Sequence, residues 1–294
     1  SVGGRGGREI VVTNLNDRGS GSLRQALSAG GPRIIRFAVE GTIELESPLV
    51  VTEGGVTIDG APVVHVIALA AVVAALAAIP FSVVIGSGAS FPLSQAVYPL
   101  VGWLLGPVAG ALATGIGAAV GTFFFPHSAT IPAATVLGAM LGGFAAGTMR
   151  PDRIRQRWWL GVTLFAIVAY LLYGGRAVVV NQVAWWAVVA GSVINWSGLL
   201  LFVLPTRRRF AQWIGSEVKG RRFWGLFLGT WSVAGLAHLT TATIVYFVKN
   251  WPAHIWLAFA PMAPFENALR ALVGAIIGTG VIAGLHATRL VKPK

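Results

Sequence analysis

The sequence has no cysteine and little charge, and both absences narrow its possible functions. Because none of its 294 residues is cysteine, disulfides, thiolate catalysis and cysteine metal sites are excluded. Charged residues make up 11% of the chain, whereas ordinary soluble domains carry roughly a quarter. Acidic residues are scarcest after residue 63, where only Asp152, Glu217 and Glu266 occur. Carboxylate metal cages need several acids, so we predict no metal site and no cofactor.

The motifs of common enzyme classes are also missing. The chain contains no HExxH, no GxxxxGK[ST] and no GxSxG, and GSGAS at 86–90 does not place serine between the required glycines. We therefore predict no catalytic residues, no enzyme activity and no ATP hydrolysis by this chain. Of its 22 lysines and arginines, 16 follow residue 63. They lie between apolar runs, as in cytoplasmic loops of membrane proteins, so we expect no nucleic-acid partner.

One long stretch without charge dominates the rest of the chain. Residues 90–149 hold no Asp, Glu, Lys or Arg, and such a stretch is too long for one buried soluble helix, which indicates a lipid bilayer. Small residues recur every four positions within it. This spacing places them on one helix face and lets helix backbones approach closely. They are Gly102, Gly106 and Gly110; Ala109, Ala113, Gly117 and Gly121; Gly138 with Gly142; and Gly143 with Gly147.

Composition changes sharply near Val63, which predicts a fragment at 1–62 and an integral membrane helical domain at 63–294. The expected fold class is mainly α: a polytopic transmembrane helical bundle of about 6–8 segments with a small N-terminal β-rich fragment. The expected segments are Val63–Gly86, Phe91–Leu105, Pro107–Phe125, Ile131–Met149, Trp158–Tyr173, Val178–Leu204, Phe223–Val248 and Ala268–Leu290. The proline-containing stretch Trp251–Phe265 is expected to be interfacial or re-entrant.

The basic loops predict the orientation of this domain. Arg150–Arg157, Arg207–Arg222 and Arg289–Lys294 fall on one side if eight segments alternate. Because cytoplasmic loops collect lysine and arginine, we expect a multi-pass protein of the plasma (inner) membrane with both termini cytoplasmic. If the short second segment joined the third as one re-entrant element, the N-terminus would lie outside.

The N-terminal fragment alternates β-rich runs with turn residues. Strands are expected at Glu9–Thr13, Arg33–Val39, Thr42–Leu45, Leu49–Thr52 and Val56–Ile58, with a helix at Ser22–Ser28. GGRGG at 3–7, VTNLND at 12–17, GSGSLRQAL at 19–27, GTIELESPLVV at 41–51 and VTIDG at 56–60 resemble the N-terminal part of the pectate lyase family. This resemblance implies the first turns of a right-handed parallel β-helix. That family's calcium-binding and catalytic residues lie on later coils, so Arg24, Glu44 and Glu46 are interpreted as surface charges.

The membrane domain resembles a substrate-binding S component of energy-coupling-factor (ECF) vitamin transporters. The resemblance rests on the alanine-rich first helix, GSGASFPLS at 86–94, the run at 99–129 and FENALRALVGAIIG at 265–278. It implies uptake of a vitamin-like small molecule with a separate coupling subunit and its ATPases. In that family the small-residue first helix docks onto the coupling subunit, which here implies a docking face at Ala70, Ala74 and Ala78.

Polar residues in apolar segments are the candidate substrate-binding residues, because such groups are costly in a membrane. They are Gln95, Tyr98, His127, Asn181, Asn195, Trp196 and His238. Hydrogen bonds between helices are the alternative interpretation for the amides, and Glu266 with Arg270 is expected to form a helix cap and a local ion pair. Two other functions stay open: a membrane sensor or scaffold, and a truncated polysaccharide lyase joined to an unrelated membrane chain.

Overall fold

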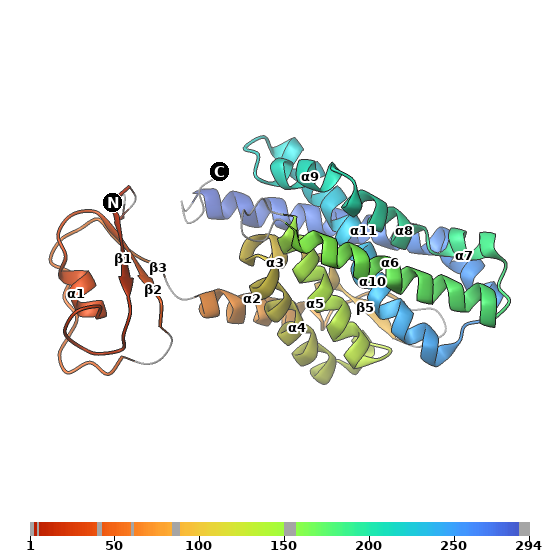
Figure 1. Cartoon of the computed structure of the whole chain (residues 1–294), viewed down its shortest axis with the longest axis horizontal. Helices are drawn as coiled ribbons and strands as arrows, with labels where there is room; N and C mark the ends of the chain where they lie inside the picture. Colours follow the sequence, from red (N-terminus) through yellow and green to blue (C-terminus); the bar gives the residue numbers. More distant parts are fainter. Residues whose placement is uncertain are drawn as a thin grey trace. The chain divides into compact units, whose positions relative to one another are not determined.

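The computed structural model describes residues 3–4, 6–39, 43–59, 62–83, 89–149 and 157–287. The chain forms two compact units, Ser1–His65 and Val66–Lys294, whereas the sequence placed the boundary between residues 62 and 63. The first unit contains a small parallel sheet and the second is helical (Figure 1). Most of the predicted basic loop at Arg150–Arg157, and all of Arg289–Lys294, lies outside the described residues.

Three parallel strands form the sheet of the N-terminal unit. Strands β1 (Arg8–Val12), β2 (Arg33–Phe37) and β3 (Val56–Asp59) lie in chain order. Helix α1 (Leu23–Ser28) begins after Ser22, whose hydroxyl accepts a hydrogen bond from the Gln25 amide as an N-cap does. The core contains Val12, Ala26, Leu27 and Ile35. Parallel strands in chain order are what the first turns of a β-helix require.

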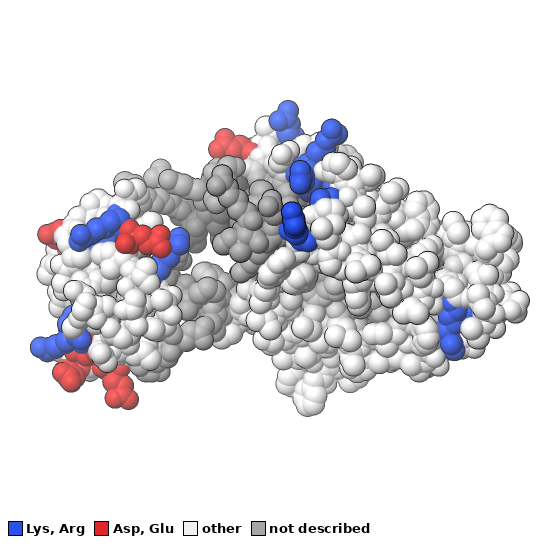
Figure 2. All heavy atoms as spheres, in the orientation of Figure 1, with Lys and Arg blue, Asp and Glu red and all other residues white. Residues whose placement is uncertain are grey.

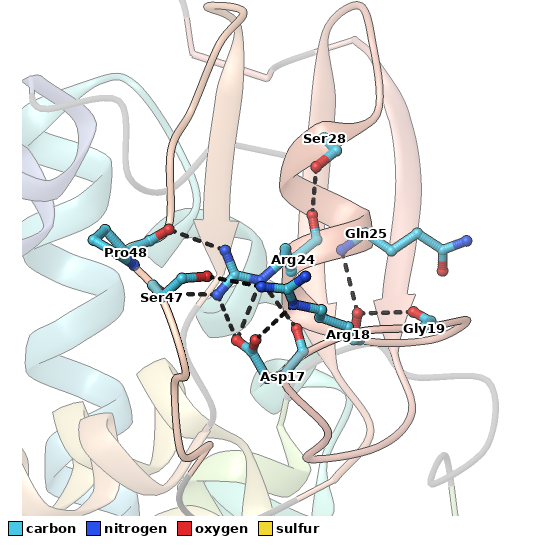
Figure 3. Close-up of polar contacts among 9 residues, drawn as sticks. Asp17, Arg18, Gly19, Arg24, Gln25, Ser28, Ser47 and Pro48 are labelled. Carbon is cyan, nitrogen blue, oxygen red and sulfur yellow. Dashed lines mark hydrogen bonds and ion pairs between the residues drawn. The ribbon is translucent and has the colours of Figure 1, made fainter.

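The two strands predicted between β2 and β3 are wrong. Residues 43–45 and 49–52 form irregular backbone, while Thr42 lies outside the described residues. This segment is held by a side chain instead, since the Arg24 guanidinium donates to the carbonyls of Ser47 at 2.7 Å and Pro48 at 3.0 Å (Figure 3). It also donates to Asp17 Oδ1 at 2.5 Å. Arg24 is therefore a partly buried structural residue and not the surface charge expected.

A second arginine, Arg33, binds carbonyl groups at the C-terminal end of α1. Arg33 is fully buried and donates to the carbonyls of Ala26 at 3.1 Å, Leu27 at 2.5 Å and Gly31 at 2.8 Å. The last carbonyls of a helix lack partners within the helix and carry partial negative charge. One guanidinium therefore satisfies these acceptors and ties α1 to β2.

The helical unit contains helices of very different length. They are α2 (Pro62–Leu76), α3 (Tyr98–Leu105), α4 (Pro107–Phe124), α5 (Pro132–Thr148), α6 (Trp158–Gly175), α7 (Trp185–Gly191), α8 (Val193–Val203), α9 (Thr206–Ile214), α10 (Lys219–Lys249) and α11 (Ala253–Ala287). The short elements are β4 (Pro80–Val83), β5 (Ser90–Pro92), the 3₁₀ turns η1 (Leu93–Ala96) and η2 (Pro126–Ser128), and the π-helical turn η3 (Arg176–Val180).

Among the described residues, four helices are long and apolar enough to cross a membrane: α4, α6 with η3, α10 and α11. The α7–α8 pair, bent by 69°, would make a fifth crossing. By length and composition the unit therefore fits a multi-pass membrane protein. It has fewer long helices than the eight predicted segments, because α2, α3 and α5 are short.

Glycines bring α3, α4 and α5 into close contact. A Cβ atom added at Gly102 would lie 2.1 Å from the Gly143 carbonyl oxygen, and one added at Gly110 would lie 2.7 Å from Gly102 Cα. Only glycine leaves room for such an approach, which is the arrangement that small residues at four-residue spacing favour. The glycine repeats of the sequence thus form contacts inside the molecule.

Helix α2 packs on α4 through part of the predicted docking face of Ala70, Ala74 and Ala78. Ala70 is buried, and a Cβ at Gly117 would lie 2.6 Å from its carbonyl oxygen. Ala74 and Ala78 are half-buried. The helix ends at Leu76, and Pro80 begins β4, so the span predicted at Val63–Gly86 is shorter than expected.

Two later segments also differ from prediction. The expected helix Val178–Leu204 is broken into η3, α7 and α8, with Gln182 in the left-handed region at φ 55° and a 69° bend beside Ser192. The expected re-entrant piece Trp251–Phe265 is instead mostly the first half of α11, which runs the length of the unit (Figure 1). Buried Trp256 fixes it by packing 4.7 Å from the Tyr173 ring.

The predicted basic loop Arg207–Arg222 contains a helix, α9. Arg207 is buried, with its guanidinium 3.5 Å from the Trp159 ring centre, and it donates to the Val203 carbonyl at 2.7 Å. Arg207 therefore binds a carbonyl group at the C-terminal end of α8, where the helix dipole favours a cation. Figure 2 shows basic side chains gathered at this end of the helical unit, while most of its visible surface is uncharged.

Candidate functional site

Two adjoining cavities lie among α5, α10, α11 and the segment from β5 to α3. The first has a free volume of about 30 Å³ and the second of about 60 Å³. Each exceeds the roughly 10–15 Å³ that one water molecule requires. The two cavities share five lining residues: Phe91, Gln95, Thr135, His238 and Thr241. We treat them as one candidate binding site.

Short elements before α3 place three of the lining side chains. Pairing of β4 with β5 sets Phe91 opposite Ser82, and η1 follows directly and carries Gln95. Tyr98 begins α3, where it is buried with its hydroxyl 3.2 Å from Ser94 Oγ. Gln95 and Tyr98, both predicted from the sequence as binding residues, thus line the first cavity.

His238 is positioned by a buried amide. Its Nδ1 lies 3.0 Å from Asn195 Oδ1, which joins α10 to α8, and the Phe91 ring centre is 6.0 Å from the imidazole centre. If the amide oxygen accepts, Nδ1 carries the proton and Nε2 is left as an acceptor. His238 lines both cavities, whereas Asn195 lines neither and instead orients His238.

The first cavity also contains a buried cation, Arg270 on α11. Its side chain is only 3% exposed and donates from Nη1 to Asn267 Oδ1 at 3.1 Å. The Asn267 amide in turn donates to the Trp231 carbonyl at 3.4 Å. The Phe91 ring centre lies 5.2 Å from the guanidinium carbon, within the range of a cation–π contact. Arg270 is thus held in one orientation by neutral groups.

The predicted role of Glu266 with Arg270 is wrong. Glu266 lies well inside α11 and is not at its start, so it is not a cap. Within the described residues, ion pairs closer than 4.0 Å occur only in the N-terminal unit. Glu266 instead lines the second cavity, while Arg270 lines the first.

Three other predicted binding residues do not line these cavities. His127 is exposed in η2 and packs on Phe125. Asn181 donates to the Tyr246 hydroxyl. Trp196 donates to the Val189 carbonyl at 3.0 Å and lines a separate groove with other tryptophans.

Sequence reasoning missed several lining residues, chiefly Phe91, Thr135, Thr241, Glu266 and Arg270. A charge within an apolar segment was the available signal for Arg270. In the described part of the chain, no group of three His, Asp or Glu side chains is arranged to hold a metal ion.

Comparison with known proteins covers only a small part of the chain. No family model and no solved structure matches. Curated relatives are the probable pectate lyases C of Aspergillus terreus and Emericella nidulans, each 57% identical over 53 residues, and of Aspergillus fumigatus, 53% identical over 53 residues. The match covers 18% of this chain, and the chain spans 12% of the length of these relatives. They support the pectate-lyase-like part of the sequence.

Proposed function

We propose that the chain is a membrane-embedded subunit that binds a vitamin-like small molecule for uptake. The observation that carries this proposal is the convergence of Gln95, Tyr98 and His238 on one cavity within an apolar helical bundle. Polar groups at such positions are costly and tend to mark ligand pathways. The adjoining free volumes, about 30 Å³ and about 60 Å³, leave room for a small polar group beside these side chains.

Uptake against a gradient would require a separate ATPase module, since the sequence has no phosphate-binding GxxxxGK[ST] motif. We propose that a transmembrane coupling subunit docks on α2. Ala70 faces α4, so the exposed face available to a partner carries Ile67, Ala71, Val72 and Ala75. Pull-down of the coupling subunit should be lost in Ala71→Leu while the isolated chain stays folded. If Ala71→Leu still pulled down the coupling subunit as well as the unmodified chain does, the docking site on α2 would be contradicted.

Solute binding can be tested on the full chain in lipid nanodiscs. Native mass spectrometry should detect a retained small molecule, and its occupancy should fall at least about tenfold in His238→Ala, the loss of one good polar contact. Ile116→Ala, on the exposed face of α4, serves as the control and should retain the ligand. A chain that retains no small molecule after mild extraction, or equal retention in both variants, would contradict the proposal.

The relatives favour a second candidate, a truncated polysaccharide lyase joined to a membrane chain. We propose that the chain lacks this activity, because it spans only 12% of the length of those lyases. The purified chain should release no unsaturated product from polygalacturonate with calcium. Calcium-dependent release would establish an enzyme after all.

A further inference from the structure

We propose that the cavity binds a solute through a single carboxylate group, anchored by Arg270. This inference rests on the proposed solute-binding function and adds the chemical class of the ligand. It starts from a charged side chain that is 3% exposed and lines the first cavity.

The guanidinium is oriented but incompletely paired. Arginine presents five N–H donors in a planar fork, and within the described residues Arg270 donates a hydrogen bond to the Asn267 side chain. Asn267 is fully buried and held by the Trp231 carbonyl. A buried charge without a counterion in contact with it is unfavourable, and a planar fork matches a carboxylate with two parallel hydrogen bonds. The remaining donors therefore favour a carboxylate ligand.

The chain offers few acids that could neutralise Arg270 instead. Only Asp152, Glu217 and Glu266 follow residue 63. Glu266 attracts the guanidinium through space but lies more than 4.0 Å from it, so the two form no ion pair. Glu217 precedes the start of α10, far along that helix from Thr241. Asp152 lies outside the described residues.

The lining favours a monoanion with an apolar body over a dianion. Arg270 is the one Lys or Arg among the described lining residues, and Glu266 adds negative charge to the adjoining cavity. A second negative charge on the ligand would therefore lack a cation and be repelled. Phe91, Val233 and Ala234 supply apolar surface beside the guanidinium.

The absence of cysteine makes the charge of the cavity measurable with thiol reagents. In Thr241→Cys the new thiol lines both cavities. It is treated with an anionic reagent, 2-sulfonatoethyl methanethiosulfonate, and with the cationic 2-(trimethylammonium)ethyl analogue. Each anion-to-cation rate ratio is divided by that of Ser20→Cys, an exposed position in the N-terminal unit, which removes the intrinsic difference between the reagents.

In Thr241→Cys the normalised ratio should be about ten or more, because Arg270 attracts the anionic reagent. Adding Arg270→Gln should lower this ratio by a similar factor. Arg270→Lys keeps the charge and should keep the preference for the anionic reagent. If Arg270→Gln does not fold, the normalised ratios of Thr241→Cys alone and of Thr241→Cys with Arg270→Lys still test the inference, because both should show a preference for the anionic reagent. No preference for the anion, or no modification by either reagent, would overturn the inference.

Protection experiments identify the anion. Benzoate should slow modification of the Thr241→Cys thiol more than benzamide or phenyl phosphate at equal concentration. Equal or greater protection by benzamide or phenyl phosphate would overturn the carboxylate assignment. The proposed function would survive that outcome if native mass spectrometry still showed a retained solute, so the two failures are distinguishable.

Discussion

Arg24 joins three segments of the N-terminal unit through one guanidinium (Figure 3). The hydrogen bond from the Arg24 guanidinium to the Asp17 carboxylate holds the pKa of Asp17 below its ordinary value of 3.8. A carboxylate whose pKa is lowered by folding stabilises the fold above its unfolded pKa, and this contribution is lost as pH falls through the folded pKa. We therefore expect the N-terminal unit to lose stability as pH falls below about 4.

Asp17→Asn should weaken the unit at neutral pH and flatten its pH dependence in that acidic range. Hydrogen exchange of peptides from residues 8–37, corrected for the intrinsic effect of pH, measures this. Glu9→Gln is the control, because the Glu9–Arg36 ion pair is about half exposed and exposed pairs contribute little. An unchanged pH profile in Asp17→Asn would contradict the assignment.

Residues of the candidate site could be predicted from the sequence only where a polar side chain interrupts an apolar segment. Gln95, Tyr98 and His238 satisfied that criterion and line the first cavity. Arg270 was paired with Glu266 because residues four apart adjoin on a helix. In the folded chain Asn267, three residues away on the same helix, accepts the hydrogen bond. Residues three and four apart are both neighbours on a helix, so spacing alone could not choose between Asn267 and Glu266.

Helices α3, α4 and α5 depend on glycine at their contacts. A Cβ in Gly143→Ala would meet the Gly110 carbonyl oxygen at 2.5 Å, so the helices must separate. We expect a loss of about 1–3 kcal/mol, as in other overpacked interiors, measured by unfolding in detergent. Gly161→Ala on α6, where a Cβ has no neighbour within 4 Å, should be neutral or stabilising. Equal stability of both variants would refute this contact.

Apolar patterns located the helical regions better than their ends and breaks. The segment Val178–Leu204 reads as one continuous apolar run, yet it breaks where Gln182 adopts positive φ and again at the bend after Gly191. In the N-terminal unit, Leu49–Thr52 has strand-forming residues but pairs with no strand among the described residues, and Arg24 binds the carbonyls of the preceding Ser47 and Pro48. Such outcomes depend on tertiary partners, which local pattern does not contain.

For the whole molecule, the excess of lysine and arginine in loops predicts that both termini face the cytoplasm. Reporter fusions after Gly60 and at Lys294 should both give cytoplasmic signals. Because α3 has only 8 residues, an extracellular signal after Gly60 alone would mean that α3 and α4 form one re-entrant element. A fusion in the turn at Ser216, between α9 and α10, should agree with them. An extracellular signal from the C-terminal fusion would contradict this topology.

Pro261 and Pro264 lie inside α11, just before the turn that carries Arg270. Each lacks an amide proton, so two backbone hydrogen bonds are missing from the middle of this helix. Trp256 packs on one side of this gap, and Ala271 and Ala275 are buried on the other. Local opening of a protein follows cooperative units of this kind. We therefore expect the two halves of α11 to open separately, so that backbone amides around Arg270 exchange hydrogen with solvent without unfolding of the half anchored by Trp256.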